Sequence, residues 1–260
     1  MITLLHSSKT MRTISPANEP LSTPVLLDRA AKLNTALAQL SVNEIKKLMK
    51  VSEKIALETK QKIEAWNIEQ QQQTPAMDSF VGDIYSGLRS LSLTPNQRRY
   101  AQDHLRILSG LYGILRPLDG IMPYRLEMGY KSPHSESNNL YEFWGDSIAR
   151  TLAKNTPILN LTSNEYAKAA LPHLHTNRVI TPRFLTVNKK TNIPTFVVVH
   201  AKIARGAMAR WTIITQVSTE SELQKFNDLG YSYSNRLSVE LQPVFVCQEF
   251  KGIGLSQRLQ

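Results

Sequence analysis

Charged and phenolic side chains recur at loops along this chain, several of them directly after short apolar runs. Lys9 follows the run at residues 2–6, and Glu165 follows the run at residues 158–161. Open α/β sheets bind ligands at the carboxyl ends of their strands, so such positions are candidates for chemistry. Seven residues form the candidate catalytic set: Lys9, Asp83, Tyr85, Arg125, Glu127, Asp146 and Glu165.

The carboxylates among these candidates favour an enzyme over a surface that only binds DNA. Recognition of a phosphate backbone gains nothing from Asp or Glu, whereas general acid–base chemistry uses both signs of charge. One hypothesis is therefore an enzyme acting on a nucleotide, nucleobase or other small anionic substrate in a basic cleft, to which Lys202 and Arg205 would add charge. The alternative is that the acids cap helices and pair with arginines.

A second constrained region is the apolar stretch at residues 104–129, which contains four glycines, two prolines and three arginines. The pattern predicts a helix that ends at Gly110 and a tight turn with a second permissive position at Gly113. Backbone amides of such a turn suit a phosphate. The arrangement resembles a helix-hairpin-helix DNA module, although two residues separate the glycines and Pro117 shortens the second helix. A plain structural turn remains the alternative.

The charge of the chain favours an anionic partner. The formal net charge is +10 and the isoelectric point is about 9.7. Residues 178–210 include seven basic side chains and no acidic one, a pattern typical of a surface that faces duplex DNA or another polyanion. The candidate DNA-binding residues are Arg106, Gly110, Leu111, Tyr112, Gly113, Arg116, Lys202, Arg205 and Arg210.

Other classes of protein and site find little support. Cys247 is the single cysteine, so an intrachain disulfide framework is excluded and a reducing compartment is expected. No apolar run is long enough to cross a membrane, and the first residues lack a signal-peptide pattern, so we predict a cytoplasmic protein without a membrane partner. His173 and His175 lack a third ligand nearby. Phosphate-loop and dinucleotide motifs are also missing, and we predict neither a metal site nor a cofactor.

Periodicity and turn residues predict a mixed architecture. Strands are expected at residues 2–6, 158–161, 178–187 and 195–204, with a final pair at 231–239 and 244–247. Helices are expected from Ser41, which forms a capping box with Glu44, to about residue 66, and from Thr94–Pro95 onward. These elements predict an α/β fold, of mixed α+β type, as a single domain at residues 1–260 with a mixed sheet flanked by helices.

Five blocks, in this order and spacing, resemble the YaaA peroxide-stress family. They are Gly82-Asp83-Ile84-Tyr85-Ser86-Gly87-Leu88, residues 105–129, Leu140-Tyr141-Glu142-Phe143-Trp144-Gly145-Asp146, Asn160-Leu161-Thr162-Ser163-Asn164-Glu165-Tyr166 and Ala201-Lys202-Ile203-Ala204-Arg205-Gly206. Together they cover nearly the whole chain.

The resemblance implies a fold peculiar to that family, with a positively charged cleft and a helix-hairpin-helix-like element that binds duplex DNA. It further implies protection against hydrogen peroxide, associated with limiting free iron and oxidative DNA damage. The first strand of the family typically ends Ile-Ser-Pro-Ala-Lys-Thr. Here the sequence is Leu5-His6-Ser7-Ser8-Lys9-Thr10, which keeps the lysine and threonine but loses the proline and has His6 at the serine position.

Overall fold

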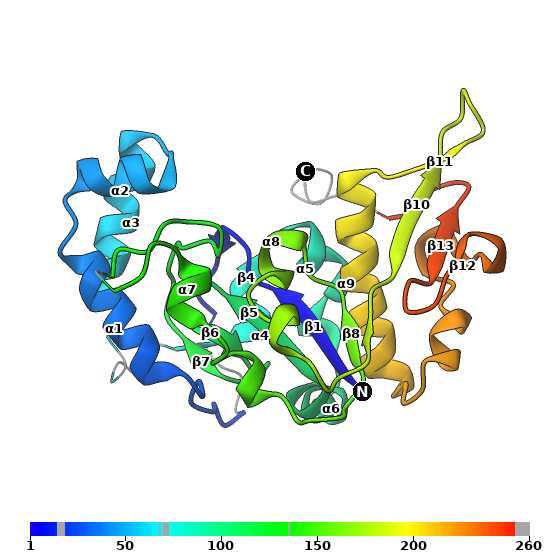
Figure 1. Cartoon of the computed structure of the whole chain (residues 1–260), viewed down its shortest axis with the longest axis horizontal. Helices are drawn as coiled ribbons and strands as arrows, with labels where there is room; N and C mark the ends of the chain where they lie inside the picture. Colours follow the sequence, from blue (N-terminus) through cyan, green and yellow to red (C-terminus); the bar gives the residue numbers. More distant parts are fainter. Residues whose placement is uncertain (15–18, 68, 70–72, 135, 253–260) are drawn as a thin grey trace.

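A five-stranded sheet lies at the centre of the computed structural model, which describes residues 1–14, 19–67, 69, 73–134 and 136–252. Its strand order is β6-β5-β1-β8-β9 (Figure 1), and only the edge strand β6 is antiparallel to its neighbour. The mixed α/β class predicted from the sequence is confirmed. The strands are β1 (Ile2–His6), β5 (Leu105–Ser109), β6 (Gly113–Leu115), β8 (Ile158–Asn160) and β9 (Val179–Ile180).

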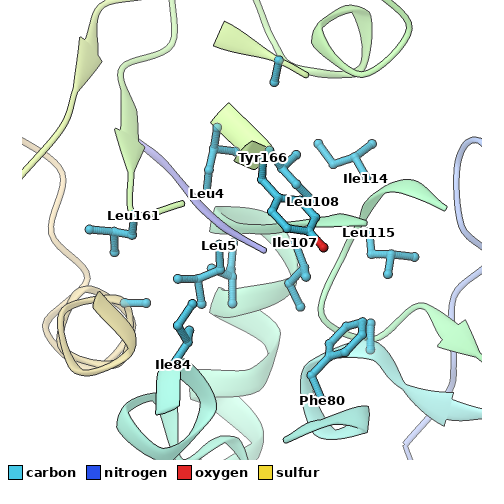
Figure 2. Packing of buried hydrophobic residues seen from close by; sticks show 14 of the residues in the cluster. Leu4, Leu5, Phe80, Ile84, Ile107, Leu108, Ile114, Leu115, Leu161 and Tyr166 are labelled. Carbon is cyan, nitrogen blue, oxygen red and sulfur yellow. The ribbon is translucent and has the colours of Figure 1, made fainter. Parts of the chain in front are cut away.

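The middle strand β1 is buried on both faces. Leu4 and Leu5 are fully buried, and Leu5 pairs in register with Ile107 of β5. Figure 2 shows these side chains packed with Ile84 from one side and with Tyr166 from another. Because β5, β1 and β8 are parallel neighbours, their carboxyl ends open on the same edge of the sheet.

A second sheet has the order β11-β10-β13-β12 and lies beyond helix α9 (Figure 1). The prediction of a strand at residues 195–204 is wrong after Thr195, because α9 begins at Val198. The β-branched run before His200 resembles a strand locally, but the small residues after it allow a close helix–helix contact that decides the conformation. The elements are β10 (Arg183–Val187), β11 (Pro194–Thr195), α9 (Val198–Thr215), β12 (Tyr231–Tyr233) and β13 (Val244–Cys247).

Helix α9 crosses α5 (Asp83–Leu88) through paired glycines. A Cβ atom at Gly206 would lie 1.7 Å from the carbonyl oxygen of Ile84, and one at Gly87 would lie 2.1 Å from that of Ile203. Only glycine permits backbones to approach this closely. The crossing places α9 beside the segment that begins α5.

Helices α1, α2 and α3 form one end of the molecule (Figure 1). The capping box predicted for Ser41 and Glu44 is confirmed. The helix start predicted at Thr94–Pro95 is also confirmed, and the structure adds a second capping box there, between Thr94 and Gln97. The single helix expected up to residue 66 is divided at Lys50, which adopts a left-handed conformation with φ of 51°. The bounds are α1 (Leu27–Ala38), α2 (Val42–Met49), α3 (Glu53–Ala65) and α6 (Pro95–His104).

Short elements connect these layers. The structure forms helices α4 (Ala76–Ser79), α7 (Leu140–Trp144) and α8 (Asn164–Ala167), and pairs strand β2 (Thr10–Met11) with β4 (Phe80–Val81) and β3 (Thr74–Pro75) with β7 (Gly120–Ile121). Turns of 3-10 helix occur at Ser90–Ser92, Ala149–Thr151, Leu171–His173, Ser221–Lys225, Asp228–Gly230 and Asn235–Leu237.

The glycine turn at residues 110–112 joins two strands. The helix predicted to reach Ser109 ends at His104, and Leu105–Ser109 forms strand β5 instead. After the turn the chain returns as β6, antiparallel to β5. Leu105, Ile107 and Leu108 are fully buried in the sheet, and this tertiary burial overrides the helical pattern. A helix-hairpin-helix-like element is not found at this turn.

Candidate active site

A pocket of about 440 Å³ opens at the carboxyl end of β1; we call it the strand-end pocket. The loop after β1 forms one wall, and segments from α5, α8 and α9 form others. Ser8 joins the loop to the opposite wall by donating a hydrogen bond to the carbonyl of Val81. The lining residues are His6, Ser7, Ser8, Lys9, Thr10, Val81, Gly82, Asp83, Ile84, Tyr85, Glu127, Ser163, Glu165, Tyr166 and Lys202.

Most of the candidate catalytic residues meet in this pocket. Lys9, Asp83, Tyr85, Glu127 and Glu165 all contribute to its lining, although they come from four separate segments of the chain. Lys202 of α9 joins them. These side chains therefore share one cavity instead of lying dispersed over the surface.

One ion pair orders the rim of the pocket. The Lys9 ammonium lies 2.9 Å from a carboxylate oxygen of Glu127, with side-chain exposures of 54% and 19%. The Tyr130 hydroxyl donates to the same carboxylate at 3.1 Å. Glu165 accepts a hydrogen bond from the Gly129 amide at 2.8 Å. These contacts fix two carboxylates and a lysine in place without burying them completely.

Two other charged groups of the pocket carry no such restraint. Within the described part of the chain, the side chains of Asp83 and Lys202 form no hydrogen bond or ion pair, and both line the cavity. A carboxylate and an ammonium in this situation are available to a ligand.

His6 is held neutral at the base of the pocket. Burial, and after it the positive charges of Arg205 and Lys202, together lower its pKa from 6.5 to about 3. Its Nδ1 lies 3.3 Å from the Ser163 amide, which can only donate. A neutral imidazole that accepts at Nδ1 carries its proton at Nε2, so His6 is a hydrogen-bond donor there.

Two buried tyrosines support the loop after β1. The Tyr85 hydroxyl donates to the carbonyl of His6 at 2.9 Å, and the Tyr166 hydroxyl lies 3.1 Å from Oγ of Ser7. Burial raises the pKa of both phenols well above the ordinary value. They are neutral hydrogen-bonding groups at physiological pH, and Tyr166 also packs against the His6 ring with centroids 4.7 Å apart.

The balance of charge in the pocket differs from the basic cleft expected from the sequence. Its lining includes three carboxylates, Asp83, Glu127 and Glu165, against two lysines, Lys9 and Lys202. His6 adds no charge. The pocket therefore suits a polar molecule with hydrogen-bond donors better than a strongly anionic one.

Three of the charged residues expected in the enzyme's cleft lie outside the lining of the pocket. Asp146 forms an exposed ion pair with Arg150 at 2.7 Å. Arg125 directs one nitrogen toward the Lys9 carbonyl at 3.5 Å and acts behind the rim. Arg205 is half-buried, and burial lowers its pKa. Of these three, Arg205 acts on the pocket through its charge, which lowers the pKa of His6.

The glycine turn is internal to the fold. Gly110 and Gly113 are buried, and Leu111 and Tyr112 are exposed by 1% and 2%. The Tyr112 amide donates to Oγ of Ser109 at 3.0 Å, and the Trp144 indole donates to the Gly110 carbonyl at 3.1 Å. The polar groups of this turn are thus used within the molecule.

The arginines of the candidate DNA-binding set mostly bind the protein's own backbone. Arg106 donates to the carbonyls of Gln102 and Leu105, and Arg210 donates to those of Leu88 and Arg89. Arg116 pairs with the buried Asp119 at 3.3 Å. The structure leaves these side chains at three separate places, at the ends of α6 and α5 and before β7.

The described residues lack two other features. They contain no group of three or more His, Cys, Asp or Glu side chains arranged to hold a metal ion. Nor does any described helix have the length and apolar character needed to span a membrane.

Comparison with known proteins identifies the relatives of this chain. A family model described as peroxide stress protein YaaA matches residues 1–237. The chain belongs to the YaaA peroxide-stress family. A UPF0246 protein of Salinispora tropica is 51% identical over 258 residues, which are 99% of this chain and 98% of that protein. UPF0246 proteins of Marinomonas sp. strain MWYL1 and Idiomarina loihiensis are 39% and 41% identical, covering 95% and 88% of this chain and 96% and 91% of their own lengths.

Sequence reasoning missed part of the pocket of this family member. His6, Ser7 and Tyr166 line it but were not among the candidates. His6 stands where the family has serine, and that departure was the one available signal. Tyr166 resembled a core aromatic residue, since nothing in the sequence shows that its hydroxyl meets the loop after β1.

Proposed function

We propose that this chain contributes to peroxide stress protection as an enzyme that acts on a small polar metabolite in the strand-end pocket. The observation that supports the proposal best is the convergence of Lys9, Asp83, Glu127, Glu165 and Lys202 around one cavity. Scattered ion pairs do not require such convergence, whereas acid–base catalysis does.

The residues suit distinct tasks in such a reaction. Asp83, whose carboxylate has no hydrogen-bond or ion-pair partner among the described residues, is the proposed general base. Lys202 is the proposed group that stabilises negative charge as it develops on the substrate. The Lys9–Glu127 pair and the Nε2–H of His6 orient the substrate by hydrogen bonds.

This proposal places iron limitation downstream of the reaction. Because the described residues form no metal cluster, we do not assign iron storage to them. Protection of the cell would follow from removal of the substrate or formation of the product.

The experiment is a comparison of metabolite profiles. Purified protein is incubated with a protein-free extract of peroxide-treated bacteria, and mass spectrometry records the small molecules before and after. We expect one metabolite to decline and another to accumulate with the wild-type chain, and neither change with the Asp83→Asn, Lys202→Gln double variant. Lys54→Gln, an exposed position on α3, is the control. Identical profiles with and without wild-type protein would overturn the proposal.

Duplex DNA is a second candidate ligand, supported by a different surface. Lys189 and Lys190 are exposed in the connection between β10 and β11, and neither forms an ion pair within the described residues. Unpaired cations of this kind favour contact with phosphates. A Lys189→Gln, Lys190→Gln variant should bind a random-sequence duplex more weakly at low salt. Equal affinity of variant and wild type would exclude this surface.

A further inference from the structure

A second cavity lies beside the strand-end pocket, and we call it the arginine groove. Its volume is about 320 Å³, and it shares Val81, Gly82 and Tyr85 with the pocket. Residues from the end of α5 and the turn after it form the opposite side. The lining residues are Arg12, Phe80, Val81, Gly82, Tyr85, Ser86, Arg89, Ser90, Leu91 and Ser92.

The two cavities differ in charge. The strand-end pocket has three carboxylates and two lysines in its lining, whereas the arginine groove has two arginines and no carboxylate. An anionic group is therefore repelled by part of the first cavity and attracted by the second. The separation between them is only the backbone at Val81–Gly82 and the Tyr85 side chain.

Arg12 is held in position with its terminal nitrogens available. Its Nε donates to the carbonyl of Asp78 at 2.9 Å. The Asp78 carboxylate does not neutralise it, because that group pairs with Arg98 at 2.8 Å, and Arg98 also binds Glu19 at 2.7 Å. Among the described residues, neither terminal nitrogen of Arg12 has a hydrogen-bond partner.

Arg89 supplies the second guanidinium. It ends α5 in a left-handed conformation with φ of 48°, and its exposed side chain makes no hydrogen bond or ion pair in the described part of the chain. Arg210 donates to the Arg89 carbonyl at 3.1 Å. Burial, and after it the charge of Arg89, lower the pKa of Arg210, so the two guanidinium groups lie close enough to repel each other.

Gly82 lies at the boundary between the two cavities and has no side chain to fill it. It has φ of 154°, and a Cβ atom there would lie 3.1 Å from Oγ of Ser8. Asp83 lines the pocket and Ser86 and Arg89 line the groove, and Gly82 lines both. One extended molecule can therefore contact both cavities.

We propose that the arginine groove binds a phosphate group of the ligand whose polar portion occupies the strand-end pocket. Phosphate binding by the groove stands by itself, whereas the occupation of the strand-end pocket by the same ligand rests on the proposed function. Guanidinium groups form paired, charge-assisted hydrogen bonds with phosphate oxygens, which suits Arg12 and Arg89 to this task. The substrate class is thus a phosphorylated small molecule whose unphosphorylated part is rich in hydrogen-bond donors.

In the first experiment, isotope-labelled protein is titrated with inorganic phosphate. The NMR signals of the arginine Nε–H groups report binding. We expect saturable shifts of the Arg12 and Arg89 signals. Arg12→Gln or Arg89→Gln alone should weaken phosphate binding about tenfold, the effect of one charge-assisted hydrogen bond. Lys54→Gln should leave it unchanged. The absence of saturable shifts, or equal affinity in the Arg12→Gln, Arg89→Gln double variant, would overturn the proposal.

A second titration separates two sources of the phosphate. Methyl phosphate represents a small phosphomonoester, and dimethyl phosphate represents the diester of a nucleic-acid backbone. We expect tighter binding of methyl phosphate, because it has two negative charges for two guanidinium groups. Equal or tighter binding of dimethyl phosphate would overturn the assignment to a small phosphorylated molecule and identify a polynucleotide backbone instead.

The same variants keep this inference distinct from the proposed function. Asp83→Asn with Lys202→Gln should abolish metabolite turnover and leave phosphate binding in the groove intact. Phosphate binding without any turnover by the wild-type chain would reject the enzyme and retain the groove. Turnover that is unaffected by Arg12→Gln with Arg89→Gln would retain the enzyme and reject the groove as the site of a phosphate group of its substrate.

Discussion

Two neighbouring strands of the central sheet, β5 and β1, end at the same edge and lead to opposite outcomes. After β5 the chain turns back at once into β6, and the turn is packed under Trp144. After β1 the chain leaves the sheet and pairs with β4, and the space beside it is the strand-end pocket. The closely spaced glycines after β5 therefore indicate close packing, whereas charged residues far apart in the sequence come together to form the pocket.

The largest expected effect tests the packing role of the turn. A Cβ atom at Gly110 would lie 2.3 Å from the carbonyl oxygen of Leu126, which is backbone and cannot move aside. Gly110→Ala should therefore lower the free energy of unfolding by about 3 kcal/mol, as overpacking does. Chemical denaturation followed by circular dichroism measures the change. A variant as stable as the wild type would show that the turn is not a packing device.

His6 in the pocket makes the free energy of unfolding depend on pH, whereas the turn contains no such group. The folded-state pKa is about 3 and the unfolded value is 6.5, so the unfolded chain binds a proton between these values and the folded chain does not. This contribution is complete above pH 6.5 and declines as the pH falls toward 3, by about 2 kcal/mol between pH 6.5 and 5.

The measurement is denaturant unfolding at several pH values for the wild type and His6→Gln. The wild type should lose more stability on acidification than the variant. Equal slopes in the two proteins would mean that His6 is not held neutral in the folded state.

A smaller effect is expected from the hydroxyl that supports the turn. The Tyr124 hydroxyl lies 2.7 Å from Oγ of Ser109, the same atom that binds the Tyr112 amide. Tyr124→Phe should lower stability by about 1 kcal/mol, the typical net value of one hydrogen bond. Tyr233→Phe is the matched control, because no hydrogen bond of its hydroxyl is formed in the described residues. Equal melting temperatures of the two variants would contradict the prediction.

The smallest expected effect is on the stability of pocket variants. Asp83→Asn and Lys202→Gln should each change the free energy of unfolding by less than about 0.5 kcal/mol, since neither side chain has a partner among the described residues. Thermal unfolding measures this directly. A loss as large as that of Gly110→Ala would show that these residues hold the fold together and would remove the contrast between the two regions.

The sequence by itself determined the local features of this protein. The apolar run of β1, the capping box of α2 and the start of α6 at Thr94–Pro95 could be recognised from neighbouring residues. Lys9 and Glu127 lie in loops as expected, whereas Asp83, Tyr85 and Glu165 lie in the short helices α5 and α8. Capping and alternation depend on residues a few positions apart, and such patterns survive folding. The order and spacing of the five sequence blocks also indicated the YaaA family, which the family model confirmed.

Only the tertiary structure decided which of these features act together. Residues 105–109 became a strand because β1 offered a buried partner, and residues 198–204 became helical because Gly206 could pack against α5. His6 lies in the pocket because the fold brings the end of β1 next to Ser163 and Tyr166, which are far from it in the sequence. Contacts between residues far apart in the chain provide most of the burial energy, and they determine where a local pattern leads.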